Sequence, residues 1–135
     1  MSLLAWSNMF SVGVKVIDDQ HRKLLDLANK LNDEMAAGHG KEVLGKILAD
    51  LIAYTQYHFD TEHKLMAEHQ YSASAGHKEA HNQLVKQVAE LKKKYDKGEN
   101  VLTSEVMVFL RDWLTKHIMN TDKALGRELN QKGVK

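Results

Sequence analysis

The chain has 135 residues, with 19 lysine and arginine side chains against 18 aspartate and glutamate side chains, and no cysteine. This length predicts one domain around a single core. The balanced charge, with no run of one sign longer than residues 92–94, lacks the footprint of a nucleic-acid or membrane-surface binder, so we expect neither partner. Without cysteine, disulfides, iron–sulfur clusters and thiolate zinc sites are excluded, and any metal must be held by nitrogen and oxygen.

The N-terminal residues and the hydropathy of the chain indicate the cellular compartment of the protein. The first six residues lack the charged start and long apolar stretch of a secretion signal. No later segment approaches the ~20 apolar residues of a membrane span. We therefore expect a cytoplasmic protein.

The absence of proline and four long amphipathic stretches predict an all-α fold. Short connections between them favour an antiparallel up-down-up-down four-helix bundle with an N-terminal arm and a short C-terminal tail. We expect a single domain composed of the arm (1–17), the bundle (18–122) and a polar tail (123–135). The arm carries Trp6 and Phe10 and is expected to pack across the bundle as a lid.

The first helix is predicted to begin near Asp18 or Asp19, since carboxylates suit a helix N-terminus, and to end before the glycine turn at 38–40. The second should run from about residue 41 to 68. The third should start near Ser74, and the fourth near Thr103 or Ser104.

Each predicted helix carries an apolar stripe with alternating spacings of four and three, and polar side chains interrupt all four stripes. Burying so many polar groups without partners would cost several kcal/mol each, so we expect them to share a metal centre. In an up-down-up-down bundle the start of an odd helix lies beside the end of an even one, which brings them all to one end. The six interrupting residues are His21, His58, Glu62, His77, His81 and His117.

Spacing within the helices also suits chelation. Residues four apart lie about 40° apart around a helix axis, so His58 with Glu62, and His77 with His81, each offer two donors to one site. Asp122 follows His117 by five residues, which turns a straight helix about 140° away. For Asp122 to join, we predict a π-bulge or an unwound turn between these two residues.

The remaining histidines have simpler explanations. A lone histidine on an apolar stripe is usually a satisfied core residue, but five at one depth on four helices are not explained in that way. His39 lies in a glycine turn, His63 is rotated about 100° from Glu62, and His69 lies two turns beyond Glu62. We expect these three in solvent.

The set of donor atoms limits which metal ions could bind. Five imidazoles and two carboxylates are too many for one tetrahedral zinc and too rich in nitrogen for calcium or magnesium. They suit two first-row transition metals, with iron the natural candidate. If both carboxylates and a solvent-derived oxo or hydroxo group bridge, all but one position of two octahedra is filled. The open position would accept a small diatomic ligand.

The segments around these residues resemble the hemerythrin family, specifically its stand-alone bacteriohemerythrin type, over nearly the whole chain. All seven ligand positions are present in order. The chain departs from the family where His63 follows Glu62, a place where a second glutamate is common, and where Lys15 and Ser72 replace frequent prolines; His63 could act as a base behind the ligands. The matching segments are 13–21, 58–62, 77–81 and 113–122.

The resemblance implies a non-haem di-iron centre, bridged by an oxo or hydroxo group, that binds dioxygen reversibly for transport, storage or delivery. Three histidines would hold the coordinatively saturated iron and two the iron with the open position, while Glu62 and Asp122 bridge. An apolar pocket would exclude water, although its residues would be core in any bundle. The saturated iron is assigned His77, His81 and His117, the other iron His21 and His58, and the pocket Leu24, Phe59, Trp113, Leu114 and Ile118.

Two other classes of function stay open. A sensor or redox module usually needs an output domain, for which 135 residues leave no room. A di-iron enzyme that handles peroxide, nitric oxide or iron would favour the carboxylate-rich Glu-x-x-His pattern of ferritin-like proteins. Since this site is rich in histidine, the ferrous state should be favoured and oxygen release eased, so we expect a binding protein and not an enzyme. An oxygen-consuming client protein is a possible partner.

Overall fold

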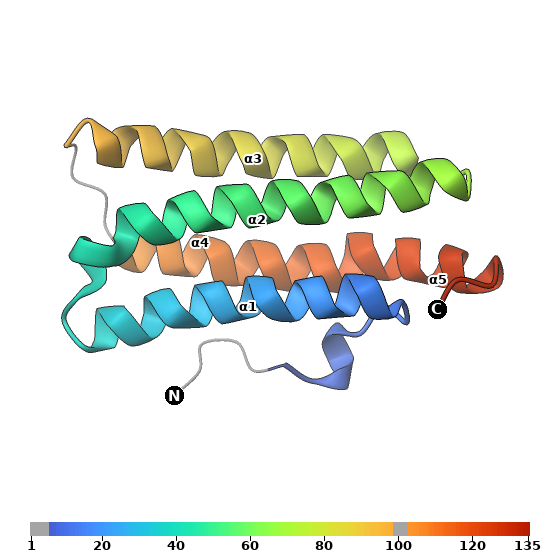
Figure 1. Cartoon of the computed structure of the whole chain (residues 1–135), viewed down its shortest axis with the longest axis horizontal. Helices are drawn as coiled ribbons and strands as arrows, with labels where there is room; N and C mark the ends of the chain where they lie inside the picture. The colour runs from blue at the N-terminus through green and yellow to red at the C-terminus, as the bar shows by residue number, and fades with distance from the viewer. Residues whose placement is uncertain (1–5, 99–102) are drawn as a thin grey trace.

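The structure is a computed structural model that describes residues 6–98 and 103–135, with only the backbone at 103 and 104. Long helices lie side by side in an antiparallel bundle (Figure 1), which confirms the predicted fold class, and no strand occurs in the described ranges. None of the described helices is long and apolar enough to cross a membrane. The helices are α1 (Lys15–Ala36), α2 (Gly40–Glu68), α3 (Ser74–Asp96), α4 (Thr103–Lys116) and α5 (Lys123–Gln131), the last two joined by the π-helical segment η2 (His117–Asp122).

Helix α1 begins earlier than predicted, at Lys15 and not near Asp18. The Asp18 carboxylate does not cap its own helix but accepts hydrogen bonds from the arm before it, from the Val12 amide at 2.8 Å and the Ser11 hydroxyl at 2.6 Å. The helix ends at Ala36, and Gly38 follows with a φ of +83°, a conformation that glycine adopts without strain. The N-terminal boundary of the bundle therefore lies three residues before the predicted one.

The described part of the predicted N-terminal arm before α1, residues 6–14, packs against the bundle. It contains a short 3₁₀ helix, η1 (Asn8–Phe10), and its Val12 and Val14 side chains are buried. The guanidinium carbon of Arg22 lies 4.6 Å from the centre of the Trp6 ring, a cation–π contact that holds the arm against α1.

The segment predicted as a polar tail is mostly helical. Helix α5 continues the line of α4 at the end of the bundle where the arm also lies (Figure 1). It buries Leu125, Gly126 and Leu129, because residues three or four apart share one helix face. Polar residues cover its other faces, which hides this amphipathic pattern in a mostly polar sequence.

Helix α5 and the residue after it also form hydrogen bonds with the turn between α2 and α3. The Glu128 carboxylate accepts hydrogen bonds from the Ser72 amide at 3.0 Å and the Ser72 hydroxyl at 2.6 Å. The Lys132 ammonium donates to the backbone carbonyls of His69 and Gln70. One end of the bundle is thus closed by the arm, the α2–α3 turn and α5 together.

Candidate metal centre

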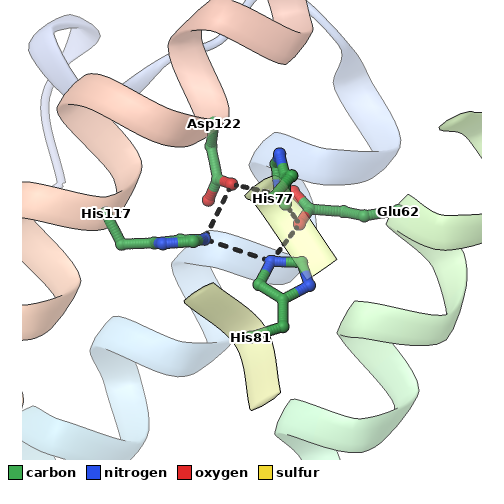
Figure 2. A group of neighbouring side chains, drawn as sticks. All are labelled: Glu62, His77, His81, His117 and Asp122. Carbon is green, nitrogen blue, oxygen red and sulfur yellow. Dashed lines mark hydrogen bonds and ion pairs between the residues drawn. The ribbon is translucent and has the colours of Figure 1, made fainter. Parts of the chain in front are cut away.

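The seven residues predicted as ligands meet in one cluster at this closed end, five of them drawn in Figure 2. Every one is buried, with no side chain more than 6% exposed. They come from four elements of the bundle, so no two neighbouring helices could form the cluster alone. They are His21 on α1, His58 and Glu62 on α2, His77 and His81 on α3, and His117 and Asp122 on η2.

The cluster divides into two groups that share both carboxylates. In each group, one donor atom from every member lies within 4.8 Å of the others. The first group contains three histidines and the second contains two. The first is Glu62, His77, His81, His117 and Asp122, and the second is His21, His58, Glu62 and Asp122.

Glu62 turns one carboxylate oxygen toward each group. Its Oε1 atom lies 3.0 Å from Nε2 of His81 and 3.1 Å from Nε2 of His77. Its Oε2 atom lies on the side of the second group, 3.5 Å from Nε2 of His58 and 3.9 Å from Nε2 of His21.

Asp122 divides its oxygens in the same way. Its Oδ1 atom lies 3.0 Å from Nε2 of His117 and 3.1 Å from Nε2 of His77, contacts marked in Figure 2. Its Oδ2 atom lies 2.8 Å from Nε2 of His21, in the second group. Both carboxylates therefore have the arrangement of a bridge between two adjoining centres.

The π-helical segment η2 brings Asp122 into the cluster, which confirms the predicted irregularity after His117. Five residues would turn an α-helix well past His117, whereas the i→i+5 pattern of a π-helix nearly stacks residues five apart. The His117 ring is held in place by Trp113, whose ring stacks on it with centroids 4.4 Å apart.

Several buried donor atoms in the cluster have no hydrogen-bond partner. They lie close to one another but are not aligned as donor and acceptor, and buried polar atoms without partners are rare in folded proteins. Of these atoms, Nε2 of His21, Oε2 of Glu62 and both carboxylate oxygens of Asp122 face the two groups, where metal ions would satisfy them. The nitrogen and oxygen donor set fits two first-row transition metals. The other two unpartnered atoms are Nδ1 of His21 and Nδ1 of His77.

The metal-free cluster holds two histidines in their neutral form. Burial, assisted by the nearby His21, lowers the pKa of His58 to about 3. Burial and the neighbouring His77 also lower the pKa of His81. Neutral imidazole is the form that binds a metal.

Charge is concentrated on the other members. Burial alone would lower the pKa of His77, but the adjacent carboxylates of Asp122 and Glu62 outweigh it and raise that pKa to about 9. Burial and the adjacent Asp122 raise the pKa of Glu62 to about 6. Burial alone would also raise the pKa of Asp122, but His117 and His21 hold it well below its usual range. Asp122 therefore carries a negative charge inside the cluster.

Two residues behind the ligands were missed or misplaced by sequence reasoning. Gln20 had no predicted role, yet its Oε1 atom accepts a hydrogen bond from Nδ1 of His58 at 2.6 Å. His63 was predicted to lie in solvent, which is wrong, because it is half-buried with Nε2 2.9 Å from Nδ1 of His81. Each directly adjoins a ligand in the sequence, and that adjacency was the one available signal.

The other two histidines lie outside the cluster. The His39 side chain is exposed, as predicted, and its Nδ1 atom lies 3.4 Å from the Glu34 carboxylate. His69 caps the C-terminus of α2 and is half-buried, so the prediction that it lies in solvent is also wrong.

Apolar side chains surround the cluster. The Phe59 ring stacks on His81, with centroids 3.5 Å apart and an angle of 4° between the planes. The five residues predicted to form an apolar pocket are Leu24, Phe59, Leu114 and Ile118, which are buried, and Trp113, which is half-buried.

The chain is thus a four-helix bundle protein with two adjoining candidate metal sites of histidine and carboxylate buried at one end. The family model described as "Hemerythrin HHE cation binding domain" matches residues 12–129. A bacteriohemerythrin of Methylococcus capsulatus is 39% identical over 127 residues, covering 93% of this chain and 96% of the relative. One of Pseudomonas aeruginosa is 34% identical over 124 residues, covering 90% and 78%.

Solved hemerythrin structures have the same fold as this chain. The crystal structure of a wild-type hemerythrin superposes with a TM-score of 0.87 at 38% identity, covering 95% of this chain and 98% of the other. The chain belongs to the hemerythrin family.

Proposed function

We propose that this protein binds dioxygen reversibly at a non-haem di-iron centre, for transport, storage or delivery. Membership of the hemerythrin family supports this function. The observation that carries it is the division of both shared carboxylates, each of which turns one oxygen toward a group of three histidines and the other toward a group of two.

The ligand roles follow from the two groups. His77, His81 and His117 would hold one iron and His21 and His58 the other, with Glu62 and Asp122 bridging. When bound, the oxo- or hydroxo-bridged iron pair supplies the redox chemistry that reversible oxygen binding needs. Because the second group has one histidine fewer, His21 and His58 would leave room for a small ligand on their side of the site.

The apolar residues would protect the site. Burial of Phe59 and Ile118 beside the ligands keeps bulk water from the histidines, which would slow autoxidation and strengthens electrostatic interactions inside the site. Trp113 covers the outer face of His117. We assign Leu24, Phe59, Trp113, Leu114 and Ile118 to this pocket.

We further propose that dioxygen is the small partner, with an oxygen-consuming client protein as the possible recipient. The balance of 19 basic and 18 acidic side chains favours neither a nucleic-acid nor a membrane partner, and the lack of cysteine is compatible with the cytoplasm. A site with more imidazole than carboxylate favours binding over enzymatic oxidation.

Optical titration tests the proposal. The protein is loaded anaerobically with iron(II), exposed to oxygen, and then purged with argon. A visible absorption band that appears with oxygen and disappears on purging supports reversible binding. Irreversible oxidation, or turnover of an added reductant, would identify an enzyme. One zinc per chain on metal analysis would reject both functions.

A further inference from the structure

We propose that His63 is a positioning residue that accepts a hydrogen bond from Nδ1 of His81 and so keeps Nε2 of His81 directed into the metal centre. This inference rests on the proposed function. The two atoms, Nε2 of His63 and Nδ1 of His81, lie 2.9 Å apart.

The inner contacts of His81 determine which of its nitrogens carries the proton. Its Nε2 atom lies 3.0 Å from Oε1 of Glu62 and 3.1 Å from Nε2 of His117, inside the first group of donors. A ligand nitrogen must present its lone pair, so the proton of a neutral His81 belongs on Nδ1. A buried N–H needs an acceptor, and Nε2 of His63 occupies that position.

The same contact determines the form of His63. To accept at Nε2, its ring must be neutral and carry its own proton on Nδ1. His63 is half-buried, so the chain of contacts runs from the metal ligand to the surface of the protein. A hydrogen bond of this kind orients a metal-binding histidine and raises its basicity as a ligand.

Packing alone does not determine which of two orientations the His81 ring adopts. Phe59 stacks on one face of His81 and fixes the plane of the ring. An apolar face does not distinguish a nitrogen edge from a carbon edge, so Phe59 would tolerate a ring turned by 180°. His63 supplies the polar contact that makes one orientation better than the other.

The second group of donors contains a parallel arrangement. Gln20 accepts from Nδ1 of His58 at 2.6 Å, and its own amide donates to the Thr61 hydroxyl at 3.1 Å. By contrast, Nδ1 of His21 and Nδ1 of His77 have no hydrogen-bond partner. In each group, therefore, at least one histidine is oriented from behind, His58 by Gln20 and His81 by His63.

Three variants test the role of His63. His63→Gln keeps an acceptor at about the position of Nε2, because the side chains have similar length, whereas His63→Leu removes the acceptor and keeps an apolar side chain. His39→Leu is the matched control, since His39 is exposed and outside the cluster. Each protein is loaded anaerobically with iron(II), and the rate of iron loss to an excess of a ferrous chelator is measured.

We expect His63→Leu to lose iron about tenfold faster than the wild-type protein, in line with the effect of other residues behind metal ligands. His63→Gln should stay within about twofold of wild type, and so should His39→Leu. Circular dichroism of the metal-free proteins should show equal helix content, because His63 lies at the surface of α2.

Nuclear magnetic resonance of the diamagnetic zinc(II)-loaded protein provides a second measurement. The Nδ1 proton of His81 should exchange slowly with solvent in wild type and His63→Gln, and rapidly in His63→Leu. Unchanged iron loss and unchanged proton exchange in His63→Leu, with two metals bound to the wild-type chain, would overturn this inference alone. A wild-type chain that binds no metal would overturn the proposed function as well.

Discussion

His117 and Asp122 are five residues apart in the chain, and Nε2 of His117 lies 3.0 Å from Oδ1 of Asp122. The π-helical turn between them makes this contact possible, since an α-helix would direct Asp122 away from the bundle interior. Asp122 also approaches His21 and His77. One carboxylate thus joins three helices at the closed end of the bundle.

Replacing this carboxylate by an amide, in Asp122→Asn, should remove the negative charge that faces His21, His77 and His117. We expect the variant to bind fewer than two irons per chain. The metal-free variant should be less stable by about 3–5 kcal/mol, because the buried histidines lose their charged partner. Iron analysis and urea denaturation measure the two effects.

Asp112→Asn is the control for that experiment. Asp112 lies one helix segment earlier, on α4, and its exposed carboxylate pairs only with the exposed Arg111 among the contacts described. Its loss should change the free energy of unfolding by no more than about 0.5 kcal/mol. Equal effects of the two substitutions would contradict the role of Asp122.

Removing metal should destabilise the wild-type protein. Metal that binds only the folded state adds about 4 kcal/mol at a thousandfold excess over its dissociation constant, which corresponds to a fall in melting temperature of roughly 10 °C or more on chelation. In His77→Ala, which loses a donor of the first group, iron content should fall and chelation should have a smaller effect.

Thermal unfolding followed by circular dichroism, with and without chelator, measures this difference. His39→Ala should behave as wild type, since the His39 side chain is exposed and lies outside the cluster. Full iron content in His77→Ala would count against the assigned ligand set.

Metal affinity should rise with pH between about 7 and 9. His77 has a pKa raised to about 9 in the metal-free protein, so at pH 7 it is protonated and must release that proton before it can bind. His58, whose pKa is lowered to about 3, is already neutral and contributes no proton in this range. Above about pH 9 the affinity should level off.

Zinc(II) titrations by calorimetry, in buffers of different ionisation enthalpy, count the protons released. More protons should be released at pH 7 than at pH 9.5. A constant proton count and a constant affinity across this range would contradict the raised pKa of His77.

Helix α5 should tolerate no side chain at Gly126. A Cβ there would overlap the backbone carbonyl of Val12, so Gly126→Ala must displace the N-terminal arm. We expect a loss of about 1–3 kcal/mol in urea denaturation. The matched variant is Gly76→Ala on α3, where nothing lies within 4 Å of an added Cβ. It should be neutral or stabilising by up to about 1 kcal/mol, because alanine favours the helix. Equal losses would show that α5 does not support the arm.

Local patterns in the sequence were enough to predict the bundle and the meeting of seven polar residues at one end. Apolar periodicity assigns each helix a face, and chain order assigns each residue a depth. Even the irregular turn before Asp122 followed from the spacing of Asp122 and His117. Helix α5 escaped prediction because its few apolar residues contact the arm and the bundle end, which are remote in sequence.

Only the tertiary structure showed which residues lie behind the ligands. Gln20 and His63 lie next to ligands in the sequence but about 100° around the helix from them, so periodicity placed neither in the site. Gln20 on α1 reaches His58 on α2, and His63 on α2 reaches His81 on α3. The apolar periodicity was sufficient to predict which face of each helix is buried. How far each helix is rotated against its neighbour depends on the packing of all four, and this rotation decides which side chains at the edge of a buried face meet a ligand.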